Sequence, residues 1–153
     1  MIEVKVVSKN GAYRRTLYPG DKVYVAARWE QKIEARAFAA ELMRAGYVVT
    51  SRWVWSEERD PAHENPNEAV RWADSDLQDI RMSDVFLLLS DGELGRGGKD
   101  FELGYAYALG KRSAVIGPPT HVFAAGLSDV RRYEDKAAFR CIYLDAEKID
   151  ALP

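Results

Sequence analysis

Short apolar runs alternate along this chain with segments of helical periodicity, and this alternation restricts the fold more than any other feature. The runs predict strands at residues 23–27, 47–50, 85–89 and 113–116. Between them, residues 30–45, 67–82 and 101–109 repeat apolar side chains every three or four positions, which predicts helices. Strands that alternate with helices favour an α/β fold in which helices cover both faces of a parallel sheet. We expect residues 140–144 to add a fifth strand with Cys141 as a buried thiol.

A β-hairpin is expected in front of this pattern. Residues 2–8 and 12–18 flank Asn10-Gly11, a pair that favours the type I′ turn of a hairpin. The predicted organisation is an N-terminal hairpin extension over residues 1–20 and one α/β domain over residues 21–153. A length of 153 residues fits a single domain of this kind.

Composition excludes several classes of partner. The formal net charge of −2 gives no overall field that would attract a nucleic-acid polymer or an anionic membrane. The single cysteine rules out an intrachain disulfide, and His63 and His121 lack the spacing of a metal site. No leader peptide and no apolar run of bilayer length are visible. We therefore expect a cytoplasmic protein that binds neither nucleic acid nor membrane.

Parallel α/β sheets bind ligands at the carboxyl ends of their strands. In this chain the four predicted strand ends carry Arg28-Trp29, Arg52-Trp53, Ser90-Asp91 and Gly117-Pro118. These four places are therefore predicted to converge on one cleft.

Glu102 is the first candidate for chemistry in that cleft. It follows the apolar run 85–89 and a glycine-rich loop, near the start of a predicted helix. The dipole of a helix favours an anion at its N-terminus, and an ionised carboxylate there is able to attack an electrophilic carbon. Two alternatives stay open, because an acid at this position also stabilises a helix and Gly97-Gly98 is either a phosphate-cradling loop or a simple turn.

Four motifs occur in a characteristic order. They are Val23-Tyr24-Val25-Ala26-Ala27-Arg28-Trp29, Gly46-Tyr47-Val48-Val49-Thr50-Ser51-Arg52-Trp53, Asp76-Leu77-Gln78-Asp79-Ile80-Arg81-Met82-Ser83-Asp84 and Phe101-Glu102-Leu103-Gly104-Tyr105-Ala106. Together they span roughly residues 21 to 140, and the last is the most specific. The chain in this respect resembles the nucleoside 2-deoxyribosyltransferase family and the related 2'-deoxynucleoside 5'-monophosphate N-glycosidases.

The resemblance implies a flavodoxin-like (Rossmann-like) fold and a role for each matching residue. Glu102 matches the nucleophile that attacks C1' of the sugar, and Tyr24 matches the tyrosine that orients it. Asp76 matches the aspartate that manages the proton of the leaving base, and Trp29 matches an aromatic residue beside that base. From the residues alone, Asp76 is equally explained by a solvated helix face and Tyr24 by core packing.

The glycine-rich loop departs from the transferase pattern. The transferases carry an acidic, base-binding residue just before the nucleophile, whereas this chain has Arg96, Gly97 and Gly98 there and Asp91 further back. Ser90, Gly97 and Gly98 are candidates to hold a 5'-phosphate, with Arg28 or Arg96 adding charge. Which base is bound, whether deoxyribose is required, and whether the substrate is a nucleoside or a monophosphate remain open.

The predicted function is cleavage of the N-glycosidic bond of a 2'-deoxynucleoside or its 5'-monophosphate. The sugar passes to another base (transferase) or to water (hydrolase), and the partners are the nucleoside or nucleotide and a free base. No metal or redox cofactor is expected, because the carboxylate supplies the covalent chemistry. The resemblance also implies a homodimer or higher homo-oligomer. The alternative is a nucleotide-binding module of the same fold that senses its ligand without turning it over.

Overall fold

A single parallel sheet organises the protein, and a computed structural model describes residues 15–57 and 65–145 of it. The strands of the described part are β1 (Lys22–Ala26), β2 (Val48–Val49), β3 (Val85–Leu89), β4 (Arg112–Ile116) and β5 (Val130–Tyr133). They pair in parallel in the order β2-β1-β3-β4-β5. This is the flavodoxin-like strand order, so the predicted fold class is confirmed. All five residues of β3 are buried, as expected of the central strand.

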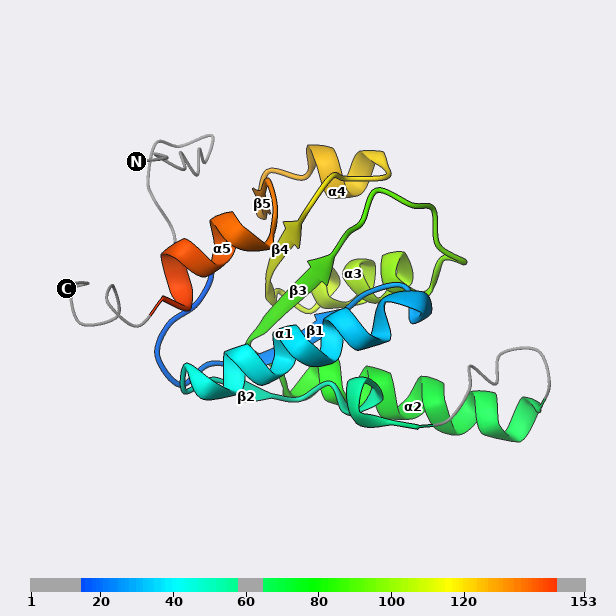
Figure 1. Cartoon of the computed structure of the whole chain (residues 1–153). Helices are drawn as coiled ribbons and strands as arrows, with labels where there is room; N and C mark the ends of the chain where they lie inside the picture. Colours follow the sequence, from blue (N-terminus) through cyan, green and yellow to red (C-terminus); the bar gives the residue numbers. More distant parts are fainter. Residues whose placement is uncertain (1–14, 58–64, 146–153) are drawn as a thin grey trace.

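Helices cover both faces of the sheet (Figure 1). The α-helices are α1 (Lys32–Arg44), α2 (Pro66–Met82), α3 (Gly98–Ala108), α4 (Val122–Gly126) and α5 (Lys136–Tyr143). Two 3-10 turns, η1 (Trp29–Gln31) and η2 (Arg52–Trp55), follow β1 and β2. An ion pair between Glu41 and Arg140 joins α1 to α5, and a hydrogen bond from Arg81 to the Tyr105 hydroxyl joins α2 to α3.

The helices begin where the local sequence favours a start. Asn65 accepts hydrogen bonds from the backbone N–H groups of Asn67 and Glu68, and Pro66 occupies the first turn of α2. Asp135 caps α5 in the same way through the N–H of Ala138.

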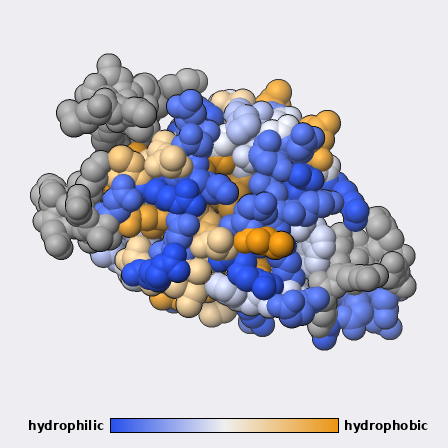
Figure 2. Space-filling view, in the orientation of Figure 1, coloured by the Kyte–Doolittle hydropathy of each residue, from blue (hydrophilic) through white to orange (hydrophobic). Residues whose placement is uncertain are grey.

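The face of the molecule shown in Figure 2 is mainly hydrophilic, with hydrophobic residues in small areas between polar ones. The apolar sides of the helices therefore face the sheet.

One predicted strand is wrong. Residues 140–144 belong mostly to α5, and the fifth strand is β5, at residues 130–133. The apolar run was ambiguous because a short buried helix and a buried strand have the same composition. Phe139 and Tyr143, four residues apart, are the side chains that α5 buries, and Cys141 is half-buried in the helix. Only Val130 and Tyr133 of β5 are buried, so its sequence lacks a clear apolar pattern.

The predicted N-terminal hairpin falls almost entirely outside the described residues. Only residues 15–18 of its second strand are described, and they form no strand. This short segment is nevertheless packed into the domain, because Leu17 is fully buried and the Thr16 N–H donates to the Tyr143 hydroxyl at 2.9 Å. Among the described residues, no helix has both the length and the apolar content needed to cross a bilayer.

Candidate active site

A cleft of about 190 Å³ lies at the carboxyl ends of β1 and β3, where the strand order predicts a ligand. Its residues fall into four groups. Acidic side chains are Glu30, Asp76 and Glu102, basic ones are Arg28, Arg96 and Lys99, aromatic ones are Trp29, Trp53 and Trp72, and small ones are Ala27, Gly95 and Gly98. Many charged groups thus share one small concave space with aromatic walls, as in a small-molecule site.

Glu102 lies one turn inside α3, because this helix begins at Gly98, three residues earlier than the sequence predicted. Its carboxyl group is half-buried in the cleft. Burial raises the pKa of Glu102 to about 8, the nearby Asp76 carboxylate adds to this rise, and the Tyr24 hydroxyl opposes it. The environment therefore holds Glu102 close to the point at which it gains or loses a proton near neutral pH.

Tyr24 combines a core position with a functional one. Its ring is fully buried in β1 and stacks on Phe86 of β3, with ring centroids 5.6 Å apart. Its hydroxyl group is buried and meets no strict hydrogen-bond geometry among the described residues. It is nevertheless near enough to Glu102 for each group to shift the pKa of the other, and burial, followed by Glu102, raises the pKa of Tyr24. A hydroxyl hydrogen rotates freely, whereas this electrostatic effect depends on how far apart the two groups lie.

Asp76 lies on the cleft side of α2 and is half-buried. Burial raises the pKa of Asp76 to about 7, and the buried Asp79 carboxylate adds to this effect. One carboxyl oxygen, Oδ1, is buried and has no hydrogen-bond partner among the described residues. A buried acceptor in this state favours protonation or a ligand that donates to it.

Aromatic rings form the apolar wall of the cleft. Trp29 lies 6.2 Å from Trp53 between ring centroids, and Trp72 reaches the same space from α2. Trp53 is fixed by a 2.7 Å hydrogen bond from its indole N–H to the Val25 carbonyl. The Lys32 ammonium group lies 4.4 Å from the centre of the Trp29 ring. Such a wall suits a flat, apolar ring that stacks or packs edge-on.

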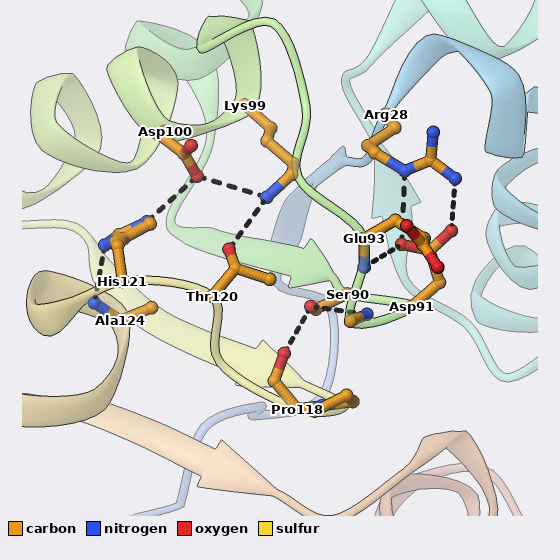
Figure 3. A network of polar contacts seen from close by, with 11 residues as sticks. Arg28, Ser90, Asp91, Glu93, Lys99, Asp100, Pro118, Thr120, His121 and Ala124 are labelled. Carbon is orange, nitrogen blue, oxygen red and sulfur yellow. Dashed lines mark hydrogen bonds and ion pairs between the residues drawn. The ribbon is translucent and has the colours of Figure 1, made fainter.

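Ion pairs connect η1 to the loop between β3 and α3. Arg28 holds Asp91 through two hydrogen bonds, of 3.1 Å and 2.5 Å (Figure 3). Arg28 also contacts Glu30 at 3.3 Å. The hydrogen bond from Arg28 lowers the pKa of Asp91. Arg96 approaches Glu30 at 3.9 Å. The loop is therefore tied to η1 across one end of the cleft.

Not all of the predicted strand ends line this cleft. Arg28, Trp29 and Trp53 do, together with the loop residue Arg96 and with Gly98 at the start of α3. Arg52 instead pairs with Asp79 at 2.9 Å.

The ends of β3 and β4 meet each other beside the cleft. The Ser90 hydroxyl donates to the Pro118 carbonyl at 2.5 Å, and Asp91 is held by Arg28. Gly97, the residue before α3, has the left-handed conformation. A methyl group on Gly117 would lie 2.0 Å from the Ser90 carbonyl oxygen, so the two strand ends are in direct contact.

Lys99 and Trp72 line the cleft although the sequence did not single them out for this role. Lys99 precedes Glu102 by three residues and therefore shares its face of α3, which was a usable signal once the helix start was known. Trp72 precedes Asp76 by four residues on α2 and gave the same kind of signal.

No family model matches the sequence, and a search of curated proteins gives no match. Solved structures do match. A 2-deoxyribosyltransferase from Bacillus psychrosaccharolyticus has a TM-score of 0.55 and 22% identity over 67% of this chain and 79% of its own. A CMP N-glycosidase from Clostridium botulinum has a TM-score of 0.53 and 17% identity over 86% of this chain and 99% of its own. The first is a deoxyribosyltransferase, as the motifs predict, and the second is an N-glycosidase of a nucleoside monophosphate, although CMP is a ribonucleotide. The comparison establishes that this chain has their fold.

Proposed function

We propose that this chain is a member of the nucleoside 2-deoxyribosyltransferase family and cleaves the N-glycosidic bond of a 2'-deoxynucleoside or its 5'-monophosphate. The observation that carries the proposal is that Glu102 and Asp76 line one aromatic-walled cleft, with the buried Tyr24 close to Glu102. Burial in this cleft raises the pKa of both carboxyl groups. A surface acid or a helix-capping acid would need neither this burial nor this neighbour. The fold shared with a deoxyribosyltransferase and a CMP N-glycosidase supports the same reading.

Glu102 is the nucleophile in this mechanism. Its carboxylate oxygen forms a bond to C1' of the sugar while the bond from C1' to the base nitrogen breaks, and that bond's electron pair leaves with the base. Asp76 transfers its proton to the departing base, which leaves as a neutral molecule. A second base or water then attacks C1', the ester bond to Glu102 breaks, and the incoming group returns a proton to Asp76.

The two carboxyl groups lie close enough to share a proton, because burial raises the pKa of both and the Asp76 charge raises the pKa of Glu102 further. The mechanism needs that proton on Asp76 and the charge on Glu102. The Tyr24 hydroxyl acts in this direction, because it lowers the pKa of Glu102 and so stabilises the ionised form.

The test is a chromatographic assay of base release from a panel of deoxynucleosides and their 5'-monophosphates, with and without an acceptor base. Base release without an acceptor identifies a hydrolase, and a new nucleoside formed only with an acceptor identifies a transferase. Peptide mass mapping of protein quenched during turnover is expected to place a sugar adduct on Glu102. A Glu134→Gln variant, which changes an exposed glutamate in the segment after β5, is the matched control for Glu102→Gln.

No turnover across the whole panel would refute the proposal. Tight binding of a nucleotide without turnover would then identify a ligand-sensing module. Full activity of Glu102→Gln would instead leave the reaction in place and remove Glu102 as its nucleophile.

A further inference from the structure

Lys99 is a buried cation in the cleft, and the mechanism above does not use it. The residue is 5% exposed and lines the cleft three positions before Glu102 on α3. Removing an ammonium group from water is costly unless charged or polar partners replace its hydration. The partners of the Lys99 ammonium group therefore decide whether it serves as a structural ion pair or as part of a binding site.

The partners of Lys99 within the fold are distant and shared. Its Nζ lies 3.2 Å from Asp100 Oδ1 and 3.4 Å from Thr120 Oγ1 (Figure 3). The same Asp100 oxygen lies 2.9 Å from His121 Nε2. His121 Nδ1 accepts the Ala124 N–H, so a neutral ring carries its proton on Nε2 and donates it to Asp100. An ammonium group has three N–H donors. The Asp100 oxygen that it shares with His121 and the Thr120 hydroxyl are together a weak set of acceptors for them.

A second cation converges on the same part of the cleft. A methyl group on Gly95 would lie 3.2 Å from Lys99 Cε and 3.3 Å from Arg28 Cγ. The stems of two cationic side chains thus pass the same backbone position, and Arg96 lines the same end of the cleft. Like charges repel each other more strongly where water is partly excluded. Asp91 and Glu30 pair with Arg28 and Asp100 pairs with Lys99, and an anion bound between the two cations would attract both.

The start of α3 adds donors to this end of the cleft. Gly97 precedes the helix and has no side chain that could cap it, so the N–H groups of the first turn have no capping side-chain acceptor. Gly98, in that first turn, lines the cleft. Arg28, Lys99 and these backbone donors thus meet around Gly95 and Gly98, which we call the basic end of the cleft, whereas Asp76 enters the cleft from α2.

We propose that Lys99 and Arg28 bind the phosphate group of the substrate, and that Lys99 makes the enzyme select a nucleoside 5'-monophosphate over the uncharged nucleoside. This inference rests on the proposed function and names the substrate class of the same site. Asp100, supported by His121, holds the Lys99 ammonium group at the cleft and leaves donor capacity for a phosphate oxygen. In the described structure the Asp91 carboxylate accepts two hydrogen bonds from the Arg28 guanidinium group. A phosphate group offers a similar pair of acceptor oxygens and would take the place of Asp91.

The experiment compares kcat/KM for one deoxynucleoside and its 5'-monophosphate in the parental protein and in Lys99→Met, which keeps the length of the side chain and removes its charge. The expected result is that the preference for the monophosphate falls by about 10- to 100-fold, as for the loss of a charge-assisted hydrogen bond. Lys22→Met is the matched control, because Lys22 is exposed at the opposite end of β1, and it should change neither value. Lys99→Arg should retain most of the preference, and melting curves establish that each variant is folded.

An equal loss for both substrates in a folded Lys99→Met protein would overturn the inference and assign Lys99 a structural role. If Lys99→Met does not fold, competition by inorganic phosphate on the parental protein decides. Phosphate should inhibit cleavage of the monophosphate competitively, and no competition would overturn the inference. Base release from nucleosides and monophosphates at equal efficiency would also overturn it, whereas no release from any substrate would overturn the proposed function. In that last case calorimetric titration with the monophosphate tests Lys99 separately, with binding lost in Lys99→Met and kept in Lys22→Met as the supporting result.

Discussion

Replacing Glu102 by Gln should stabilise the protein at alkaline pH while it abolishes turnover. Burial and the Asp76 charge raise the pKa of Glu102 from 4.5 to about 8. A raised acid pKa means that the folded state disfavours the ionised form, so stability is retained below the unfolded pKa and is lost as pH rises through the folded pKa. Glutamine has the same shape and never ionises, so the variant does not lose this stability.

The size of the effect follows from the pKa shift. A shift from 4.5 to about 8, at 1.36 kcal/mol per unit, corresponds to at most about 5 kcal/mol at pH 9. Glu102 is half-buried beside an open cleft, so solvent screening reduces the expected gain to about 2 kcal/mol. For a domain of this size that gain raises Tm by about 4–8 °C. At pH 5, close to the unfolded pKa, the gain should be below about 1 kcal/mol.

Thermal or urea unfolding of parental protein and Glu102→Gln at pH 5, 7 and 9 measures this difference directly. Glu134→Gln, an exposed change of the same chemical type, should leave the unfolding free energy within about 0.5 kcal/mol at all three values. Turnover of Glu102→Gln should fall by about 10³-fold or more. A variant that is less stable than the parental protein at pH 9, or whose difference does not change with pH, would refute the electrostatic reasoning.

Three further predictions concern the same carboxyl pair and one strand end. The rate should follow a bell-shaped pH profile with limbs near pH 7 and 8, because one proton must remain on the carboxyl pair. Asp76→Asn should lower the rate and remove the alkaline limb, and a flat profile between pH 6 and 9 would contradict this reasoning. Tyr24→Phe should move the acid limb of kcat to higher pH, because the hydroxyl that lowers the pKa of Glu102 is lost, and an unchanged limb would remove Tyr24 from the mechanism. Gly117→Ala should destabilise the fold by at least about 3 kcal/mol in urea unfolding, because the φ of Gly117 is +108° and the new methyl group would clash with the Ser90 carbonyl oxygen. Gly126→Ala is the control, because Gly126 has open space around it.

The centre of the sheet was predictable because β1, β3 and β4 are almost entirely buried. Val85–Leu89 is apolar throughout, and the structure gives β3 those same bounds. The alternation of strands with long helices then favours a parallel sheet, which was confirmed. The end of the chain was not predictable in this way. The sequence of the edge strand β5 contains Arg131 and Arg132 and therefore resembles that of a loop. The sequence of α5, with only eight residues and a short apolar run, resembles that of a buried strand.

The site was predictable only in part, because sequence order does not say where a helix begins. The motifs led to Glu102, Asp76 and Tyr24, and the fold brings Glu102 and Asp76 to one cleft with the buried Tyr24 close to Glu102. Lys99 was missed because α3 begins at Gly98, before the predicted start at 101, which turns a loop lysine into a buried helical one on the face of Glu102. Trp72 was missed because a tryptophan on an apolar helix face most often belongs to the core. Ser90 and Asp91 are engaged by Pro118 and Arg28, which no spacing along the chain indicates.

Burial has a different effect on the acidic residues of the cleft than on its basic residues. For the acidic residues, poor solvation raises the pKa values of Asp76 and Glu102, which keeps one proton available for the leaving base. At the basic end, the same exclusion of water strengthens the attraction of Lys99 and Arg28 for an anion. A bound phosphate would place negative charge in the cleft and raise the pKa of Glu102 further, unless Lys99 and Arg28 neutralised it. Lys99 therefore has a second consequence for catalysis, because a monophosphate bound without it would oppose the ionisation of the nucleophile. On this reasoning Lys99→Met should move the acid limb of kcat to higher pH for the monophosphate and leave it in place for the nucleoside, and a shift of equal size for both substrates would refute the electrostatic link between the basic end and Glu102.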